Sequence, residues 1–198
     1  TYAYWVKTSS FQGVVSKEIQ SGKWFFSREY KTGFEDYTLE TYGTYTNQDI
    51  DGVVWDLSQV ISANSRDDSF FESRGLRFKN NAYIVTKDSF FGLESLSFNF
   101  GDVRGGFLGI GTSDFDVEIS NDGSNFTTIY SGSASSSFPV ISIDVESIIT
   151  DGFTLDNGSV VDMNSNLFVR ISFSGWGLFQ DRLVNMDNLV VNYRSLIN

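Results

Sequence analysis

The 198-residue sequence contains no cysteine and no histidine, and these two absences exclude several kinds of site. Without cysteine the chain forms no disulfide bond, so its stability depends on packing or on bound ions. Without histidine it lacks the commonest general base, any Ser-His-Asp or Cys-His arrangement, and histidine-ligated zinc.

The sequence also has few basic residues and no long apolar run. It has 14 Lys and Arg against 25 Asp and Glu, a formal net charge of −11. This balance argues against nucleic-acid binding, which needs cationic contacts to phosphate. It fits cation binding, although a solvated acidic surface explains it as simply. No apolar stretch approaches the roughly 20 residues of a membrane span, so we expect no membrane insertion.

Proline is nearly absent, with one residue in the chain, whereas aromatic residues reach 16%. Aromatic and β-branched residues favour strands, and turns must then use Gly, Asn, Asp and Ser. Several short segments alternate apolar and polar residues, which is typical of strands with one buried face. They are GLRFK (75–79), AYIVT (82–86), LESLSFNF (93–100), FDVEIS (115–120), FTTIY (126–130), VISIDV (140–145) and LFVRISFSG (167–175). The sequence therefore predicts an all-β protein, an antiparallel β-sandwich of the jelly-roll type.

The pattern divides the chain into two parts. Residues 1–30 predict an N-terminal hairpin or edge extension, and residues 31–198 predict the sandwich module. Within the second part we expect a strand over residues 33–37, a loop over 42–47 and a long loop over 58–74. The sequence begins at Thr1 without an initiator Met or a signal peptide, so we expect a monomeric module within a longer chain.

The last predicted strand, residues 182–193, carries a carboxylate inside an apolar run. Burial of an unpaired charge is costly, so Asp187 needs a partner. We expect this strand to close the sandwich near residues 33–37, where Asp187 and Glu35 meet around a cation.

Three segments in order resemble a known type of module. They are GFEDY followed by GVVWDL, then RGLRFKNNAYIVTKDSFFGLESLSFNFG, then DFDVEISNDGSNFTTI with RLVNMDNLVV near the end. Over residues 31–193 the chain resembles the jelly-roll accessory modules of secreted bacterial nucleases, glycoside hydrolases and adhesins. These are similar to carbohydrate-binding modules of the galactose-binding-like and MAM-like types. The resemblance implies an extracellular location and a non-catalytic binding role.

The resemblance also implies a structural calcium ion between Glu35 on the first strand and Asp187 on the last. Calcium takes six to eight oxygen ligands, so distant carboxylates joined with backbone carbonyls suit it. The alternative is that both are edge carboxylates, exposed or paired with Arg77 or Arg182. No EF-hand loop is present.

Two glycine-rich loops, residues 101–111 and 174–182, combine aromatic and polar side chains. Sugars bind to aromatic faces, with a few polar groups that fix their orientation. The candidate ligand-binding residues are Trp176, Phe179, Arg104, Phe107, Asp102 and Gln180. The alternative is that the aromatic rings fold back over the end of the core. The expected ligand is a polysaccharide or a cell-surface glycan.

An enzyme is the less favoured interpretation. Asp114, Asp116 and Glu118 alternate on one predicted strand and form the best arrangement for a pair of catalytic carboxylates. A solvent-facing strand explains them as well. Three functions therefore compete: a carbohydrate-binding module with structural calcium, an adhesive or spacer module with protein or cell-surface partners, and a polysaccharide lyase or glycoside hydrolase.

Overall fold

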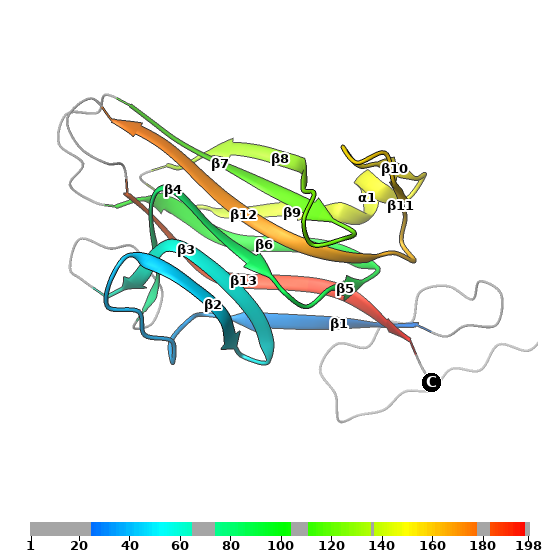
Figure 1. Cartoon of the computed structure of the whole chain (residues 1–198), viewed down its shortest axis with the longest axis horizontal. Coiled ribbons are helices and arrows are strands. Elements are labelled where there is room, and N and C mark those ends of the chain that lie inside the picture. The colour runs from blue at the N-terminus through cyan, green and yellow to red at the C-terminus, as the bar shows by residue number, and fades with distance from the viewer. Residues whose placement is uncertain (1–24, 65–73, 104–110, 136, 178–182, 197–198) are drawn as a thin grey trace, which may run out of the picture.

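The computed structural model describes residues 25–64, 74–103, 111–135, 137–177 and 183–196. This part of the chain is built almost entirely of strands (Figure 1). They are β1 (Phe25–Thr32), β2 (Gly43–Ile50), β3 (Val53–Ala63), β4 (Gly75–Thr86), β5 (Phe90–Phe91), β6 (Leu93–Asp102), β7 (Gly111–Ser120), β8 (Thr127–Ser133), β9 (Val140–Asp144), β10 (Phe153–Thr154), β11 (Val160–Val161), β12 (Asn166–Gly177) and β13 (Leu183–Leu196), with one short helix, α1 (Val145–Ile149), after β9.

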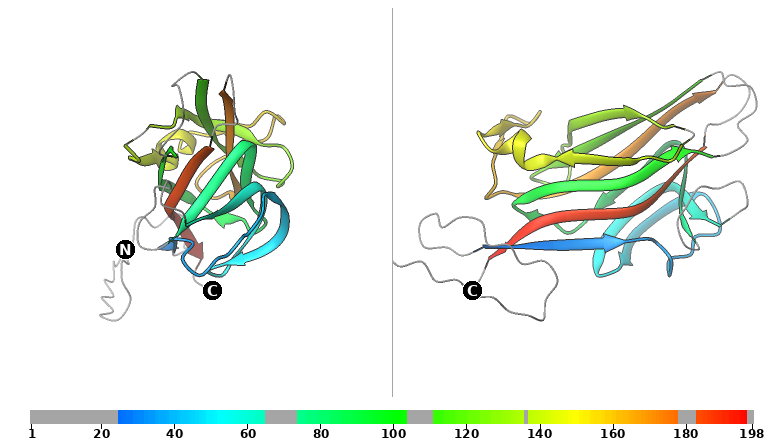
Figure 2. Two further views of the ribbon diagram at one scale, coloured as in Figure 1. Left: turned by 90° about the vertical axis from the view of Figure 1, so that its left-hand side faces the viewer. Right: turned by 180° about the vertical axis from the view of Figure 1, so that it is seen from behind.

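The strands form two layers that share a corner. One layer has the order β9-β6-β13-β1 and is seen from behind in Figure 2. The other has the order β8-β7-β12-β4-β3-β2 and faces the viewer in Figure 1. Neighbouring strands are antiparallel throughout these two layers. The predicted antiparallel jelly-roll sandwich is confirmed.

Strand β4 joins the layers because it changes partner along its length. Its first half, Leu76 to Lys79, pairs with β13, and its second half, from Ala82, pairs with β12. Asn81 lies between the halves with φ of 59°, and Gln59 in the neighbouring β3 has φ of 55° beside a register shift. Such bulges are how strands turn a corner between packed sheets.

The core between the layers is rich in phenylalanine. Five fully or almost fully buried rings come from β4, β6, β7 and β12: Phe78, Phe98, Phe100, Phe115 and Phe173. Phe100 is the centre of this cluster, since its ring lies 4.6 Å from Phe115, 6.0 Å from Phe78 and Phe98, and 6.4 Å from Phe173, between centroids. The high aromatic content therefore fills the space between the sheets.

Several local predictions were wrong. Residues 33–37 form a turn, while β2 occupies part of the expected 42–47 loop, and β3 continues to Ala63 into the expected 58–74 loop. The two strands expected over 75–79 and 82–86 are one bent strand, β4. Residues 65–73 lie outside the described part.

The helix α1 was also missed, because VISIDV predicts a strand through Val145. Asp144 ends β9 and caps α1, and its carboxylate accepts hydrogen bonds from the backbone N–H and the hydroxyl of Ser147. Val145 and Ile149 pack into the core from the helix. An aspartate three residues before a serine is a typical N-cap arrangement, and here it outweighs the β-branched pattern.

The division at residue 30 stays a prediction, since residues 1–24 lie outside the described part. Phe25 to Tyr30, which the prediction assigned to the N-terminal extension, form β1 together with Lys31 and Thr32. This strand pairs along the second half of β13, from Phe25 with Leu196 to Thr32 with Leu189.

The turn between β7 and β8 is organised by one exposed carboxylate. Asp122 accepts hydrogen bonds from the side chain and the backbone N–H of Asn125, from the backbone N–H of Ser124 and from the hydroxyl of Ser120. These bonds, the side-chain bond from Asn125 first, hold the pKa of Asp122 well below its ordinary range.

We expect Asp122→Asn to lower the thermal unfolding midpoint at neutral pH, with the difference from wild type shrinking in acid. The folded-state pKa of Asp122 is depressed, so its stabilising contribution is present above the unfolded pKa of about 3.9 and is lost as pH falls through the lower folded pKa. Thermal unfolding of both proteins between neutral pH and about pH 2 measures this. A difference that stays constant over that range would show that the charge of Asp122 contributes nothing.

Candidate functional site

The chain turns sharply after β1, and this turn carries two groups of side chains in different directions. The hydroxyl of Thr32 accepts the backbone N–H of Phe34 at 3.0 Å, and the N–H of Tyr37 donates to the carbonyl of Phe34 at 3.2 Å. Phe34 has φ of 60°, which is uncommon for a residue other than glycine. We call residues 33–37 the first turn.

The structure brings Glu35 and Asp187 together at the first turn. A β-carbon at Gly33 would lie 3.7 Å from Oδ1 of Asp187 and 3.7 Å from Oε1 of Glu35. Asp187 is fully buried, and Oδ1 accepts the backbone N–H of Asn188 at 2.6 Å. Asn188 has φ of 50° and lies in a bulge of β13. The polar pair inside the apolar run therefore marks a bulge that orients a carboxylate toward the first turn.

The chemistry of this pair suits a hard cation. Calcium prefers carboxylate oxygens completed by backbone carbonyls and amide oxygens. Gly33 has no side chain, so the carboxylates of Glu35 and Asp187 both border the space that a side chain at this position would occupy. Among the described residues no group of three or more acidic side chains is placed to hold a metal ion, so further ligands would have to come from carbonyl or amide oxygens.

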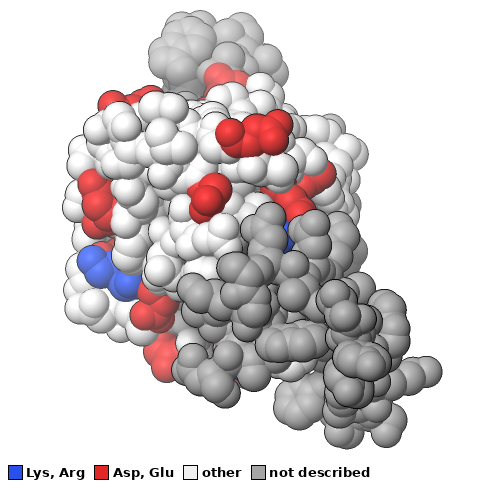
Figure 3. Space-filling model, turned by 90° about the vertical axis from the view of Figure 1, so that its right-hand side faces the viewer, with Lys and Arg blue, Asp and Glu red and all other residues white. Residues whose placement is uncertain are grey.

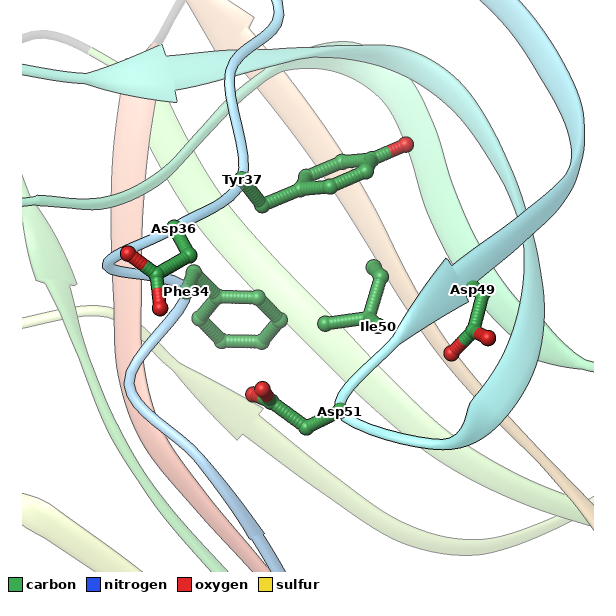
Figure 4. A pocket seen from close by; sticks show the side chains of 6 residues that line it. All are labelled: Phe34, Asp36, Tyr37, Asp49, Ile50 and Asp51. Carbon is green, nitrogen blue, oxygen red and sulfur yellow. The ribbon is translucent and has the colours of Figure 1, made fainter.

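The other side chains of the first turn line a pocket of about 190 Å³ (Figure 4). Its remaining wall is the tight turn between β2 and β3. Six residues line it: Phe34, Asp36, Tyr37, Asp49, Ile50 and Asp51. In Figure 4 the rings of Phe34 and Tyr37 lie beside Ile50, and the carboxylates of Asp36 and Asp51 lie on either side of the Phe34 ring. We call this hollow the acidic pocket.

The groups of the acidic pocket differ in how firmly they are held. The Tyr37 hydroxyl donates to Oε1 of Gln48 at 2.9 Å, and burial followed by the neighbouring Tyr45 raises the pKa of Tyr37 to about 12. Oδ1 of Asp49 accepts the backbone N–H of Gly52, so this carboxylate stabilises the turn. Within the described part of the chain, Asp36 and Asp51 make no hydrogen bond, and both are exposed.

A second polar surface lies on the outer side of β7 and β12. Arg170 pairs in register with Glu118, and its Nε lies 2.6 Å from Oε2 of that residue, while Nη2 binds Oε1. Ser172 donates to the same carboxylate at 3.1 Å, and the Arg170 guanidinium lies 4.4 Å from the centroid of the Phe126 ring. Glu118 is only 7% exposed, so this is a nearly buried, bidentate ion pair.

The other two carboxylates of that strand are also engaged. Asp116 accepts a hydrogen bond from Ser131, and Asp114 accepts one from Ser133, both across the β7–β8 pairing. The candidate catalytic carboxylates thus point to one face, as the alternation predicted. Each already has a hydrogen-bond donor from a neighbouring strand.

Of the predicted ligand-binding residues, four lie outside the described part of the chain: Arg104, Phe107, Phe179 and Gln180. The backbone of Trp176 pairs with Thr112 near the end of β12. Asp102 ends β6 and pairs with Val184 of β13. The predicted loop site therefore stays a prediction.

The charged side chains at one end of the molecule are mostly acidic. Figure 3 shows the end of the molecule that carries α1, β10 and β11, where Asp and Glu side chains are scattered over the face and few Lys or Arg appear. No helix in the described part of the chain is long and apolar enough to cross a membrane.

Comparison with solved structures identifies the fold. The chain superposes on the K2 cleaved adhesin domain of Lys-gingipain with a TM-score of 0.51 and 13% identity, over 83% of this chain and 99% of that domain. The two share one fold. The predicted resemblance to jelly-roll accessory modules is confirmed at this level.

Two carbohydrate-binding modules from Clostridium thermocellum are also similar, at lower scores. The family 11 module of the cellulosomal cellulase Lic26A-Cel5E has a TM-score of 0.43 and 16% identity over 83% of this chain and 94% of that one. The C-terminal family 22 module of Xyn10B has a TM-score of 0.45 and 9% identity over 83% and 92%. No protein-family model and no curated protein sequence matches the chain.

The acidic pocket was not predicted from the sequence. Asp36 and Tyr37 were assigned to a strand, which hid their position in a turn. The segment Asp49-Ile50-Asp51-Gly52 is a recognisable turn signal, because Asp-Gly favours tight hairpins. That signal could have located the wall of the pocket that the β2–β3 turn forms. The position of the first turn beside it depends on how the whole sheet folds.

Proposed function

We propose that this chain is a non-catalytic carbohydrate-binding module of a secreted or cell-surface bacterial protein, with calcium as a structural ion. Its ligand is a polysaccharide or cell-surface glycan. Aromatic side chains on loops contact the sugar rings, and neighbouring polar groups bind their hydroxyls.

The acidic pocket is the observation that carries this proposal. A sugar site needs an apolar ring surface together with a few convergent polar groups. The pocket combines the ring of Tyr37 with the exposed carboxylates of Asp36 and Asp51, which accept hydrogen bonds from hydroxyls. These groups stand on a turn and a hairpin that project from a rigid sheet, where binding residues are commonly placed.

Glu35 and Asp187 are the proposed calcium ligands. When bound, the ion would supply the positive charge that compensates the two carboxylates. Glu35 lies on the first turn, and Asp187 lies on the last strand, so a shared ion joins two ends of the fold. The same turn carries Asp36 and Tyr37, which links the ion to the acidic pocket.

We propose that the chain is not catalytic because the carboxylates on β7 are already engaged in hydrogen bonds. A general acid in a glycoside hydrolase must reach the glycosidic oxygen with a proton to give. Glu118, the most buried of the three, is held by both nitrogens of the Arg170 fork and by Ser172. Both oxygens of this carboxylate are therefore engaged by neighbouring side chains of the sheet, which opposes this role.

Native affinity electrophoresis against a panel of soluble polysaccharides, with calcium and with EDTA, tests the proposal. We expect one polysaccharide to retard the protein, and we expect Tyr37→Ala to lower the affinity about tenfold, which corresponds to about 1.4 kcal/mol. Trp176→Ala, at the predicted loop site, should also weaken binding while leaving the melting temperature nearly unchanged.

Tyr130→Ala is the matched control, because Tyr130 is an exposed ring on β8 away from both places. It should bind as the wild type does. Unchanged affinity in both Tyr37→Ala and Trp176→Ala would contradict the proposed sites.

An adhesive or spacer module with protein or cell-surface partners is the second candidate function. The fold shared with a cleaved adhesin domain supports it. A well-folded protein that no polysaccharide retards, with or without calcium, would favour this alternative.

A further inference from the structure

We propose that Gly33 keeps open the space in which calcium binds between Glu35 and Asp187, and that one β-carbon at this position is enough to exclude the ion. The proposal rests on the calcium site of the proposed function, and it gives a role to a residue that supplies no side-chain ligand. Gly33 lies directly after β1, where the chain enters the first turn.

The backbone does not require glycine at this position. Gly33 lies outside the left-handed region, in contrast to Gly52, whose φ of 86° favours glycine in the turn between β2 and β3. An alanine can therefore adopt the conformation of residue 33 without the strain of a left-handed φ.

The packing of the surrounding protein atoms does not require glycine either. A β-carbon at Gly33 would meet Cγ of Glu35 at 3.6 Å, Oδ1 of Asp187 at 3.7 Å and Oε1 of Glu35 at 3.7 Å, which are ordinary van der Waals contacts. At Gly92 a β-carbon would lie 2.7 Å from the carbonyl oxygen of Met163, so that the structure would have to shift. The protein alone thus leaves room for a methyl group at residue 33.

Two of the three atoms nearest to that room are carboxylate oxygens. Oδ1 of Asp187 lies at the bulge of β13, where the backbone N–H of Asn188 donates to the same oxygen at 2.6 Å. Asp187 is fully buried, and the carboxylate of Glu35 beside the same point concentrates negative charge away from water. A cation stabilises such an arrangement, whereas a methyl group does not.

A calcium ion needs more room than the two carboxylate oxygens alone. Calcium takes about six to eight oxygen ligands at about 2.3–2.6 Å, so carbonyl, amide or water oxygens must also reach it. A methyl group at residue 33 would stand in contact with both carboxylate oxygens and occupy space that those further ligands need. We therefore expect the ion-free protein to accept alanine here and the ion-bound protein to reject it.

Gly33→Ala tests the calcium site without removing any of its ligands. The variant keeps Glu35, Asp187 and the net charge of −11, so any general effect of a divalent cation on an acidic chain persists in it. Asp151→Asn, which removes one charge from an exposed turn after α1, should respond to calcium as the wild type does. Loss of the response in Gly33→Ala alone therefore reports on the space beside the two carboxylates.

Thermal unfolding in EDTA and in millimolar calcium, measured for the wild type, Gly33→Ala and Gly43→Ala, is the experiment. Gly43→Ala is the matched control, because Gly43 also lies outside the left-handed region. Its β-carbon would have the side chain of Tyr45 as its nearest neighbour, at 3.6 Å. The two variants thus add the same methyl group at the same kind of contact, but only Gly33 lies between the proposed calcium ligands.

We expect both glycine variants to melt close to the wild type in EDTA. In calcium the wild type and Gly43→Ala should melt about 5–10 °C higher, whereas the rise in Gly33→Ala should fall to about 1–2 °C, as for an affinity about a hundredfold weaker. Isothermal titration with calcium chloride should show the same loss of affinity directly.

Failure of this inference is distinguishable from failure of the proposed function. A full calcium response in Gly33→Ala, with none in Asp187→Asn, would overturn the role of Gly33 and leave the calcium site in place. A large drop in the melting temperature of Gly33→Ala in EDTA, or an equal loss of response in Gly43→Ala, would overturn it too. Absence of any calcium response in the wild type would overturn both the role of Gly33 and the calcium ion, while retardation by a polysaccharide in EDTA would still support the carbohydrate-binding module.

Discussion

Replacing Phe100 by alanine is expected to lower the free energy of unfolding by about 4 kcal/mol, within the roughly 3–5 kcal/mol range of buried phenylalanine truncations. Phe100 is fully buried at the centre of the cluster between the two layers. Its ring lies closest to that of Phe115, and the rings of Phe78, Phe98 and Phe173 surround it. This loss has two parts. One is the transfer free energy of the ring, and the other is the cost of the cavity that remains, because the four neighbouring rings relax only partly into it.

Urea unfolding followed by fluorescence measures this change. Phe100→Leu should cost much less, because leucine keeps most of the apolar volume. Val140→Ala is the surface control, since Val140 is 63% exposed on β9, and it should change stability by less than about 0.5 kcal/mol. A loss below about 1 kcal/mol for Phe100→Ala would show that the cluster is not the stabilising core of the sandwich.

The sheet architecture was predictable where alternation is simple. The clearest case is β12, where Leu167, Val169, Ile171 and Phe173 are buried and the residues between them are less buried, so period two identified this strand. The corner strands were not predictable in the same way. Asn81 and Gln59 adopt positive φ inside β4 and β3, and at this point β4 passes from one layer to the other. In the sequence these two positions are polar residues that interrupt apolar segments, so they resemble the ends of loops.

The candidate site also has one part that was predictable from the sequence and one part that was not. Asp187 could be singled out because a carboxylate in an apolar strand is costly unless it has a partner, whereas the bulge at Asn188 was not predicted. The acidic pocket could not be found in this way. Asp36, Asp49 and Asp51 are ordinary turn residues in the sequence, and only the packing of β1 and β2 against the sheet brings their two turns together.

Calcium is expected to raise the melting temperature of the wild type by about 5–10 °C. A ligand at about 100 times its dissociation constant stabilises the folded state by about 2.7 kcal/mol, and each kcal/mol shifts the midpoint of a chain of this size by about 2–4 °C. Asp187→Asn should abolish the rise. Thermal unfolding in EDTA and in millimolar calcium measures both effects.

The effect of Asp187→Asn on the melting temperature should depend on whether calcium is present. This dependence distinguishes a carboxylate that binds an ion from one that only stabilises the bulge. Asp187 is fully buried, so its charge is costly to desolvate, and asparagine keeps an oxygen that accepts the Asn188 N–H. We therefore expect Asp187→Asn to melt in EDTA at or above the wild-type temperature, and below it in calcium. Glu35→Gln should follow the same pattern, and Asp151→Asn should keep the full calcium response. A variant that is destabilised equally in EDTA and in calcium would show that Asp187 stabilises the bulge without a metal ion.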